Sequence, residues 1–217
     1  MKCIVTAGPT YEELDEVRRM TNFSSGTLGA ELADYLIDKG CEVELLRGYY
    51  STSRILPKAQ RTQNFTTTAD LSWRLEGLAS AEVGAVFHAA AVSDFGFGKI
   101  WQRAENGELT EVKSRKIATR SGTLLAELTP TPKIIGRLRG WFPKARLVGW
   151  KYELEGDGAR LMALAERQIK ENQTDVCVIN GSAYGRGFGL MRESRCRHLP
   201  DKNALFDALW QLLAEGK

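Results

Sequence analysis

The sequence has few residues that bind metals, and it has no long hydrophobic run. Its 217 residues include two histidines and four cysteines, and the cysteines, at positions 3, 41, 177 and 196, form neither a Cys-x-x-Cys pair nor a zinc-like cluster. No apolar stretch approaches the roughly 18 residues that a membrane span needs, and the chain enters its first expected strand without a signal-peptide segment. We therefore expect no metal held by the protein, no membrane partner, reduced thiols and a cytoplasmic location.

A dense basic surface is also missing. The chain has 30 Lys and Arg against 27 Asp and Glu, a net charge of +3, and the two signs alternate along it. Nucleic-acid binding requires clustered cations that neutralise a run of phosphates, so no such partner is expected. With 43% hydrophobic residues, the composition is that of a globular protein with one large domain over residues 1–217. A few cations in a cleft would still suit small anionic substrates.

Short apolar runs alternate with segments of helical periodicity, which is typical of an α/β protein. We expect strands at 2–7, 42–46, 85–90, 145–150 and 175–179. We expect helices at 28–37, 71–78, 133–141, 161–169 and 203–215. This alternation predicts a Rossmann-like, doubly wound, mostly parallel sheet.

Two stretches interrupt the alternation. Residues 49–67 are polar, with one possible short strand at 62–65, and no function is assigned to them. Residues 95–131 are glycine-rich and then charged, with possible strands at 108–113 and 124–128. A long excursion from a compact domain is often a lid or a subunit-exchange arm, so we expect a homodimer.

The candidate site lies where the strands end, because open parallel sheets bind ligands at their carboxyl edge. The first strand is followed by Ala7-Gly8-Pro9-Thr10, and a later turn, Ser24-Ser25-Gly26-Thr27-Leu28-Gly29, leads into a helix. Small residues at a helix start let backbone N–H groups approach a phosphate. The pattern is neither a P-loop nor Gly-x-Gly-x-x-Gly, so the alternative of a plain turn and helix cap stays open.

Other strand ends also offer candidate residues. The run His88-Ala89-Ala90-Ala91-Val92-Ser93-Asp94 suits a backbone that passes close to a ligand, although alanines beneath a helix and an aspartate in a turn would have the same pattern. His88 is expected to be a buried strand residue. Trp150 either stacks on a base or fills the core, Asn180 either caps a turn or binds a ligand, and Lys116 either closes over a polyphosphate or belongs to a solvated face.

Taken together, the motifs resemble those of phosphopantothenoylcysteine synthetase, the phosphopantothenate–cysteine ligase, in the stand-alone form of the DNA/pantothenate metabolism flavoprotein C-terminal family. The resemblance spans about residues 1–192. The motifs that carry it, in the family's order, are Thr6-Ala-Gly-Pro-Thr10, Asp15-Glu-Val-Arg18, Asn22-Phe-Ser-Ser-Gly26, Ala89-Ala-Ala-Val-Ser-Asp94, Thr131-Pro-Lys-Ile-Ile135 and Val148-Gly-Trp150.

The resemblance implies that a nucleoside triphosphate, CTP or ATP with Mg²⁺, activates the carboxylate of 4′-phosphopantothenate as an acyl-nucleotide. The amine of cysteine then attacks that intermediate. The implied catalytic residues are Asn22 and Lys116. The implied nucleotide-binding residues are Gly8, Ser24, Gly26, Gly29, Trp150, Asn180 and Arg167, and the implied substrate-binding residues are Arg18, Asn22, Ala90, Ala91 and Asp94.

The sequence departs from the family's pattern at three places, one of which is the segment before Lys116, which is longer and more charged than the family's. Pro9 replaces the second glycine of the usual Gly-Gly-Thr and so removes a backbone donor. The helix before the last parallel strand carries Arg167 and Glu171 where the family generally has two lysines. These departures leave two alternatives open: a degenerate paralogue that binds nucleotide only, and a ligase for another carboxylate and amine. A third alternative, a nicotinamide oxidoreductase, is suggested only by the Rossmann-like pattern, and its acidic fingerprint is missing.

Overall fold

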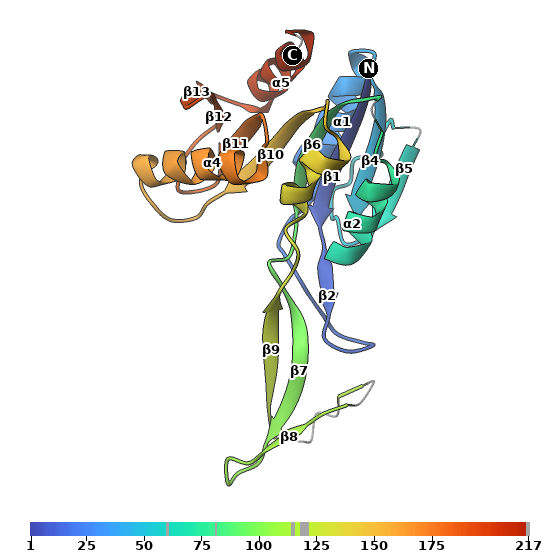
Figure 1. The fold of residues 1–217 in the computed structure, drawn as a ribbon, viewed down its shortest axis with the longest axis vertical. Coiled ribbons are helices and arrows are strands. Elements are labelled where there is room, and N and C mark those ends of the chain that lie inside the picture. Colours follow the sequence, from blue (N-terminus) through green and yellow to red (C-terminus); the bar gives the residue numbers. More distant parts are fainter. Residues whose placement is uncertain (60, 81, 114–115, 118–121, 216–217) are drawn as a thin grey trace.

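The main body of the computed structural model is an eight-stranded sheet (Figure 1). The structure describes residues 1–59, 61–80, 82–113, 116–117 and 122–215. The order across the sheet is β13-β12-β11-β10-β6-β1-β4-β5. The six neighbouring strands β11, β10, β6, β1, β4 and β5 are parallel, whereas β12 pairs antiparallel with both β11 and β13. These strands are β1 (Lys2–Pro9), β4 (Glu42–Gly48), β5 (Arg61–Phe65), β6 (Val83–Ala91), β10 (Arg146–Tyr152), β11 (Val176–Asn180), β12 (Phe188–Arg192) and β13 (Arg195–Leu199).

Helices cover both faces of this sheet, as a doubly wound fold requires. They are α1 (Thr27–Asp38), α2 (Thr68–Gly77), the 3₁₀ helix η1 (Ile134–Arg137), α3 (Leu138–Trp141), α4 (Gly158–Asn172) and α5 (Lys202–Ala214). Alternate residues of β1 face opposite layers, because side chains on a strand alternate. Val5 packs with Leu32 and Leu209 on the α1 and α5 face, whereas Ile4 packs with Leu71 of α2 on the other. The predicted Rossmann-like fold is confirmed.

The strand order also shows where a ligand site is expected. From β1 the chain moves outward through β4 and β5, and it then returns to pair β6 on the other side of β1. Strand order therefore reverses between β1 and β6. In open α/β sheets such a switch point forms a crevice at the carboxyl ends of the two strands.

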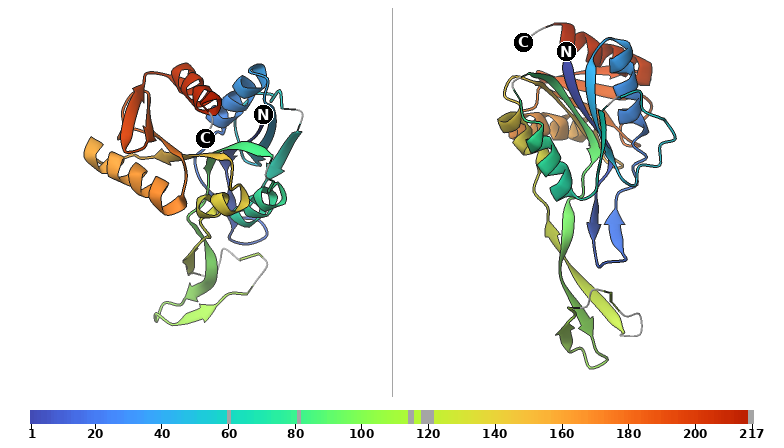
Figure 2. Two further views of the ribbon diagram at one scale, coloured as in Figure 1. Left: turned by 45° about the horizontal axis from the view of Figure 1, so that its top comes forward. Right: turned by 90° about the vertical axis from the view of Figure 1, so that its right-hand side faces the viewer.

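Two smaller sheets extend from that edge. β7 (Phe95–Arg103), β8 (Leu109–Glu111) and β9 (Thr123–Pro130) form a three-stranded sheet, which we call the arm. β2 (Tyr11–Glu13) and β3 (Arg19–Thr21) form a hairpin beside its base. Figures 1 and 2 show the arm standing away from the main sheet.

Four local features differ from the sequence prediction, and one of them is the β2–β3 hairpin, which was not predicted. The helix expected at 133–141 is a 3₁₀ turn followed by one α-turn, in a segment that contains Gly136 and Gly140. β7 was not predicted, because Gly96 and Gly98 interrupt its pattern. The β12–β13 hairpin was not predicted either. Its turn residues, Glu193 and Ser194, both have positive φ but lack the usual asparagine or glycine signal.

Candidate active site

Two glycines meet where β1 ends and α1 begins. Gly8 has a φ of +87° and Gly26 has a φ of +74°, a left-handed backbone that favours glycine. A Cβ atom on Gly26 would lie 3.1 Å from the Cα of Gly8 and 2.7 Å from the Oγ of Ser51, and a Cβ on Gly8 would overlap the same Oγ. Both glycines are therefore required by backbone conformation and by space.

Ser51 belongs to a stretch to which the sequence analysis assigned no function. Its Oγ is buried and has no hydrogen-bond partner among the described residues. Nearby, the N–H of Ser53 donates to the carbonyl oxygen of Ser25 at 2.9 Å. The loop after β4 is thereby held against residues 24–29, which we call the glycine turn. Its one sequence signal was its position, directly after a strand that neighbours β1.

The start of α1 has the features of an anion site. The hydroxyl of Ser25 donates to Thr27 Oγ1 at 2.9 Å and accepts from the Thr27 N–H at 3.2 Å. Gly29 lets the helix approach the sheet, since its Cβ would lie 2.6 Å from the Cβ of Ala7. Ser24 is partly buried in the same turn. The first N–H groups of a helix lack intrahelical partners, and the helix dipole is positive there, so the turn favours a phosphate.

The alanine-rich end of β6 lies beside this turn. In the register of the two strands, Gly8 is opposite Ala90 and Pro9 is opposite Ala91. The carbonyl oxygen of Ala91 accepts from Asn22 Nδ2 at 3.2 Å and from the N–H of Thr10 at 3.1 Å. Residues from three separate motifs are thus brought together at the switch point between β1 and β6.

Asp94 follows β6 and lies on the surface. Its carboxylate pairs with Lys133 Nζ at 2.6 Å, with 66% and 72% of the two side chains exposed. An exposed pair of this kind contributes little to stability. The arrangement nevertheless adds Lys133 to the cations near these strand ends. The sequence analysis left Lys133 out of the candidate site, although the Thr131-Pro-Lys motif contains it.

Trp150 and Asn180 lie at the ends of β10 and β11. Trp150 packs against the core on the α1 and α5 face, and its Nε1 is buried without a hydrogen-bond partner among the described residues. Both alternatives for this residue therefore retain support, because a core indole usually finds a partner for its N–H. The carbonyl oxygen of Asn180 accepts from the N–H of Glu153 at 3.0 Å.

Arg18 lies in the turn between β2 and β3, where Asp15 holds its guanidinium. Its Nε and Nη2 donate to Asp15 Oδ2 at 3.0 and 2.5 Å. Arg18 and nearby backbone N–H groups favour the ionised carboxylate and hold the pKa of Asp15 far below its usual value. Arg18 Nη2 also donates to the carbonyl oxygen of Ile117 at 2.7 Å, beside Lys116. The hairpin turn thus contacts the segment in which Lys116 lies.

Arg167 lies on α4, which packs against β10, β11, β12 and η1. It is exposed in the third turn of α4, about 14 Å along the helix axis from Gly158 at a rise of about 1.5 Å per residue. Its role toward a nucleotide stays a prediction from the resemblance.

His88 is a buried strand residue, as expected. Its Nδ1 lies 3.0 Å from Thr6 Oγ1, which already accepts from the N–H of Ala90 at 3.1 Å. The Thr6 hydroxyl proton is therefore available to Nδ1 of a neutral ring. Burial lowers the pKa of His88 to about 4, because the charged imidazolium loses its hydration. The ring stabilises the sheet and is not a proton shuttle at neutral pH.

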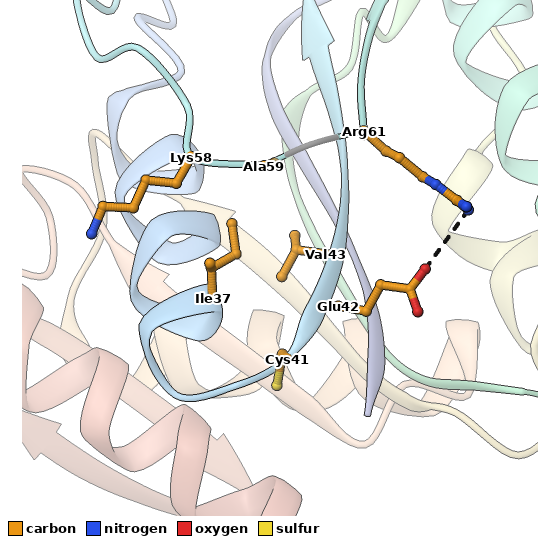
Figure 3. A pocket seen from close by; sticks show the side chains of 7 residues that line it. All are labelled: Ile37, Cys41, Glu42, Val43, Lys58, Ala59 and Arg61. Atoms are coloured by element: carbon orange, nitrogen blue, oxygen red, sulfur yellow. Dashed lines mark ion pairs between the residues drawn. The ribbon is translucent and has the colours of Figure 1, made fainter.

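A cavity of 290 Å³ lies elsewhere, beside the start of β4 and the end of α1 (Figure 3). It is bordered by an ion pair between Arg61 and Glu42 at 3.7 Å. Glu42 begins its strand, so the cavity is at the amino edge of the sheet, opposite the glycine turn. It is not part of the candidate active site.

Over the described ranges, no cluster of three or more His, Cys, Asp or Glu side chains could hold a metal ion. The described part of the chain also contains no helix with the length and apolar character of a membrane span.

The chain is similar to known proteins along most of its length. Over 181 residues it is 34% identical to the coenzyme A biosynthesis bifunctional protein CoaBC of Thermococcus kodakarensis, covering 82% of this chain and 41% of the relative. Its fold matches the DNA/pantothenate metabolism flavoprotein of Streptococcus pneumoniae with a TM-score of 0.86, at 23% identity and 99% coverage of both chains. It also matches the Cab2 mutant H337A in complex with phosphopantothenate-cysteine, with a TM-score of 0.73, 20% identity, and coverage of 99% of this chain and 85% of that one.

The family assignment rests on a match over nearly the whole sequence. The model of the DNA/pantothenate metabolism flavoprotein C-terminal domain matches residues 1–204. That range includes the glycine turn, the alanine-rich end of β6 and the arm. The chain belongs to the DNA/pantothenate metabolism flavoprotein C-terminal domain family.

Proposed function

We propose that the chain is a phosphopantothenate–cysteine ligase, which joins 4′-phosphopantothenate to cysteine in coenzyme A biosynthesis. The observation that carries this proposal is the meeting of Gly8, Gly26 and Asn22 with the end of β6 at the switch point of the sheet. A phosphate-binding turn and an amide donor there suit a nucleotide placed against an acyl substrate. The relatives named for coenzyme A biosynthesis and the family match support the same function.

The reaction has two steps. A carboxylate oxygen of 4′-phosphopantothenate attacks the α-phosphorus of the nucleotide, and the bond to the leaving pyrophosphate breaks. The amine of cysteine then attacks the acyl carbon, loses a proton and displaces the nucleoside monophosphate. Neither step needs an enzyme nucleophile, so positioning and charge supply the catalysis.

The glycine turn holds the nucleotide in this proposal. Gly8, Ser24 and Gly26 line the phosphates, and the backbone donors at the start of α1 face them. Gly29 contributes by letting α1 approach β1, because a Cβ at this position would lie 2.6 Å from the Cβ of Ala7. Trp150 and Asn180, at the next strand ends, border the nucleobase. CTP and ATP are both candidates.

In this proposal the acyl substrate lies on the β6 side of the same switch point. Ala90 and Ala91 leave room for it, Asn22 orients the acyl-nucleotide, and Asp94 binds a polar group of the substrate. Arg18 binds the substrate phosphate, and Lys116 offsets charge that develops on the triphosphate. Arg167, on α4, is assigned to the nucleotide from the resemblance alone.

The residues at the glycine turn fit a magnesium ion that arrives with the nucleotide. They offer N–H groups and hydroxyls, and the neighbouring carboxylate, Asp94, is paired with Lys133. This donor set suits phosphate oxygens better than a metal bound by the protein alone. When bound with the triphosphate, magnesium would offset negative charge on the phosphate oxygens.

Product identification tests the proposal. Purified protein is incubated with 4′-phosphopantothenate, cysteine, magnesium and either CTP or ATP, and products are identified by mass spectrometry. Pyrophosphate and the phosphopantothenoyl-cysteine amide are expected when all components are present. Nucleotide binding without turnover would favour the degenerate paralogue, and turnover with another carboxylate or amine alone would favour a related ligase.

The arm supports a further proposal, that the enzyme is a homodimer. It places apolar side chains on its surface, with 45% of Phe95, 39% of Leu125 and 51% of Leu128 exposed. A second copy of the chain packing on the arm would bury them.

All four cysteines are free thiols, which agrees with a reducing cytoplasm.

A further inference from the structure

One carboxylate organises the turn between β2 and β3. Asp15 lies in this turn with 1% of its side chain exposed. Its Oδ1 accepts from the N–H groups of Val17 at 3.0 Å and Arg18 at 2.8 Å. Its Oδ2 accepts from the Nε and Nη2 edge of the Arg18 guanidinium. These hydrogen bonds to Val17 and Arg18 are local, and by themselves they would stabilise only the turn.

The same ion pair also holds a residue far along the chain. Asp15 Oδ2 accepts from the N–H of Ile117 at 3.1 Å, and Arg18 Nη2 donates to the carbonyl oxygen of Ile117 at 2.7 Å. The side chain of Ile117 is buried, with 3% exposed. Both backbone polar groups of one residue are thus bound by one ion pair. A contact of this form fixes the chain in position as well as in orientation.

We propose that Asp15 is a positioning residue that fixes Lys116 for the nucleotidyl-transfer step and aims Arg18 at the phosphate of the acyl substrate. The inference rests on the proposed ligase function. Lys116 directly precedes Ile117, so anchoring Ile117 limits the places that the Lys116 ammonium can reach. Asp15 takes one edge of a planar guanidinium, which directs the opposite edge, at Nη1, away from the carboxylate.

The Asp15–Arg18 ion pair and its two hydrogen bonds to Ile117, which we call the clamp, couple two parts of the site. An anion at Arg18 and the position of Lys116 depend on the same guanidinium, because Nη2 contacts both Asp15 and Ile117. Misplacing a catalytic group by about 1 Å can cost about 100-fold in rate. Loss of the clamp should therefore slow acyl-nucleotide formation and weaken binding of 4′-phosphopantothenate. Aminolysis by cysteine, which follows pyrophosphate release, should not change.

Two variants separate the clamp from the turn. Asp15→Asn keeps the shape but removes the negative charge and places an amide NH₂ where donors converge. Asp15→Ser keeps an oxygen that can accept from the turn N–H groups but is too short to reach Ile117. Asp70→Asn is the matched control, because Asp70 also accepts from a backbone N–H, that of Thr66, and from an arginine Nε, that of Arg74, on α2.

Hydrogen–deuterium exchange of a peptide containing Ile117 measures the clamp without substrate. Both Asp15 variants should exchange there about tenfold faster than wild type, with Asp70→Asn unchanged. In single turnover, pyrophosphate release should slow by about 10- to 100-fold. In steady-state turnover, the KM for 4′-phosphopantothenate should rise. Once the acyl-nucleotide has formed, added cysteine should convert it at the wild-type rate.

Two results would overturn the proposal. Unchanged exchange at Ile117 in both Asp15 variants would show that the ion pair does not hold the segment. Faster exchange with normal pyrophosphate release would show that the clamp does not position Lys116. Failure of the wild type itself to release pyrophosphate would instead overturn the ligase function, and the exchange experiment would still test the clamp.

Discussion

Asn22 Nδ2 donates a hydrogen bond of 3.2 Å to the carbonyl oxygen of Ala91. The bond joins the segment that leads into the glycine turn to the last residue of β6. The same oxygen also accepts from the N–H of Thr10, so the strand end is fixed by two donors. Asn22 is exposed, so its amide is held at the surface of the carboxyl edge of the sheet.

Asn22→Ala should therefore separate the two proposed steps. Without the amide, the acyl-nucleotide is no longer oriented for attack by the amine, so it should accumulate while pyrophosphate is still released. We expect steady-state turnover to fall by about 10- to 100-fold. Quenched reactions analysed by mass spectrometry would measure the intermediate.

Asn172→Ala is the control for this variant, since its Nδ2 donates to the carbonyl oxygen of Gln168 at 2.8 Å on α4, away from the glycine turn. It should turn over normally. Normal turnover in Asn22→Ala would refute the assigned role.

Gly29→Ala should destabilise the protein through packing alone. The new Cβ would lie 2.6 Å from the Cβ of Ala7 and 3.2 Å from the carbonyl oxygen of Thr6, atoms that cannot rotate away. The helix α1 must shift from β1, which should lower the free energy of unfolding by about 1–3 kcal/mol. Urea unfolding followed by circular dichroism would measure the change.

Gly77→Ala provides the matched substitution, because this glycine also lies in a helix and no described atom is within 4 Å of its Cβ position. Its stability should stay the same or rise by up to about 1 kcal/mol. Equal losses in the two variants would show that the approach of α1 to β1 is not tight.

The predictable parts of the fold are those in which one local pattern dictates one structure. β1 is apolar at every position except Lys2 and Thr6, and α1 repeats leucines at 28, 32 and 36, so both followed from the sequence pattern. The β12–β13 hairpin did not, because Glu193 and Ser194 adopt positive φ without a glycine or asparagine. The pairing of β12 with β11 and β13 determines that turn, so the local sequence alone does not predict it.

The candidate site divides in the same way. The glycine turn and the alanine run stood out in sequence as candidates because small residues cluster there at strand ends, although the same patterns also suit a plain helix cap and packed alanines. Ser51 and Ile117 were not, since each acts through a contact with a distant segment, Ser51 with Gly8 and Ile117 with Asp15. The resemblance identified Arg18, but it did not indicate that Asp15 holds the guanidinium.

The buried His88 predicts how stability depends on pH. Its pKa is about 4 when folded and ordinarily 6.5, so the unfolded chain binds the proton more tightly. The stabilisation is complete above pH 6.5 and is lost as the pH falls toward 4. Between pH 7 and pH 5 the free energy of unfolding should fall by about 2 kcal/mol from this residue.

His88→Asn is the variant that isolates this effect, because an asparagine Oδ1 can accept from the Thr6 hydroxyl and does not titrate. It should be less stable at pH 7, since a buried ring is removed. Its stability should then change less than that of wild type between pH 7 and 5. Parallel pH profiles for the two proteins would contradict the burial of a neutral His88.

The apolar surface of the arm leads to a prediction about assembly. Leu128 is paired with Phe97 in the register of β9 and β7, and half of its side chain is exposed. If a second copy covers it, Leu128→Glu buries an unpaired carboxylate in the interface, which is strongly unfavourable. Light scattering after size exclusion should then find a dimer for wild type and a monomer for the variant. Leu56→Glu, at a leucine that is 89% exposed and lies outside the arm, should remain a dimer. A monomeric wild type at micromolar concentration, or a dimeric Leu128→Glu, would place the subunit interface elsewhere or remove it.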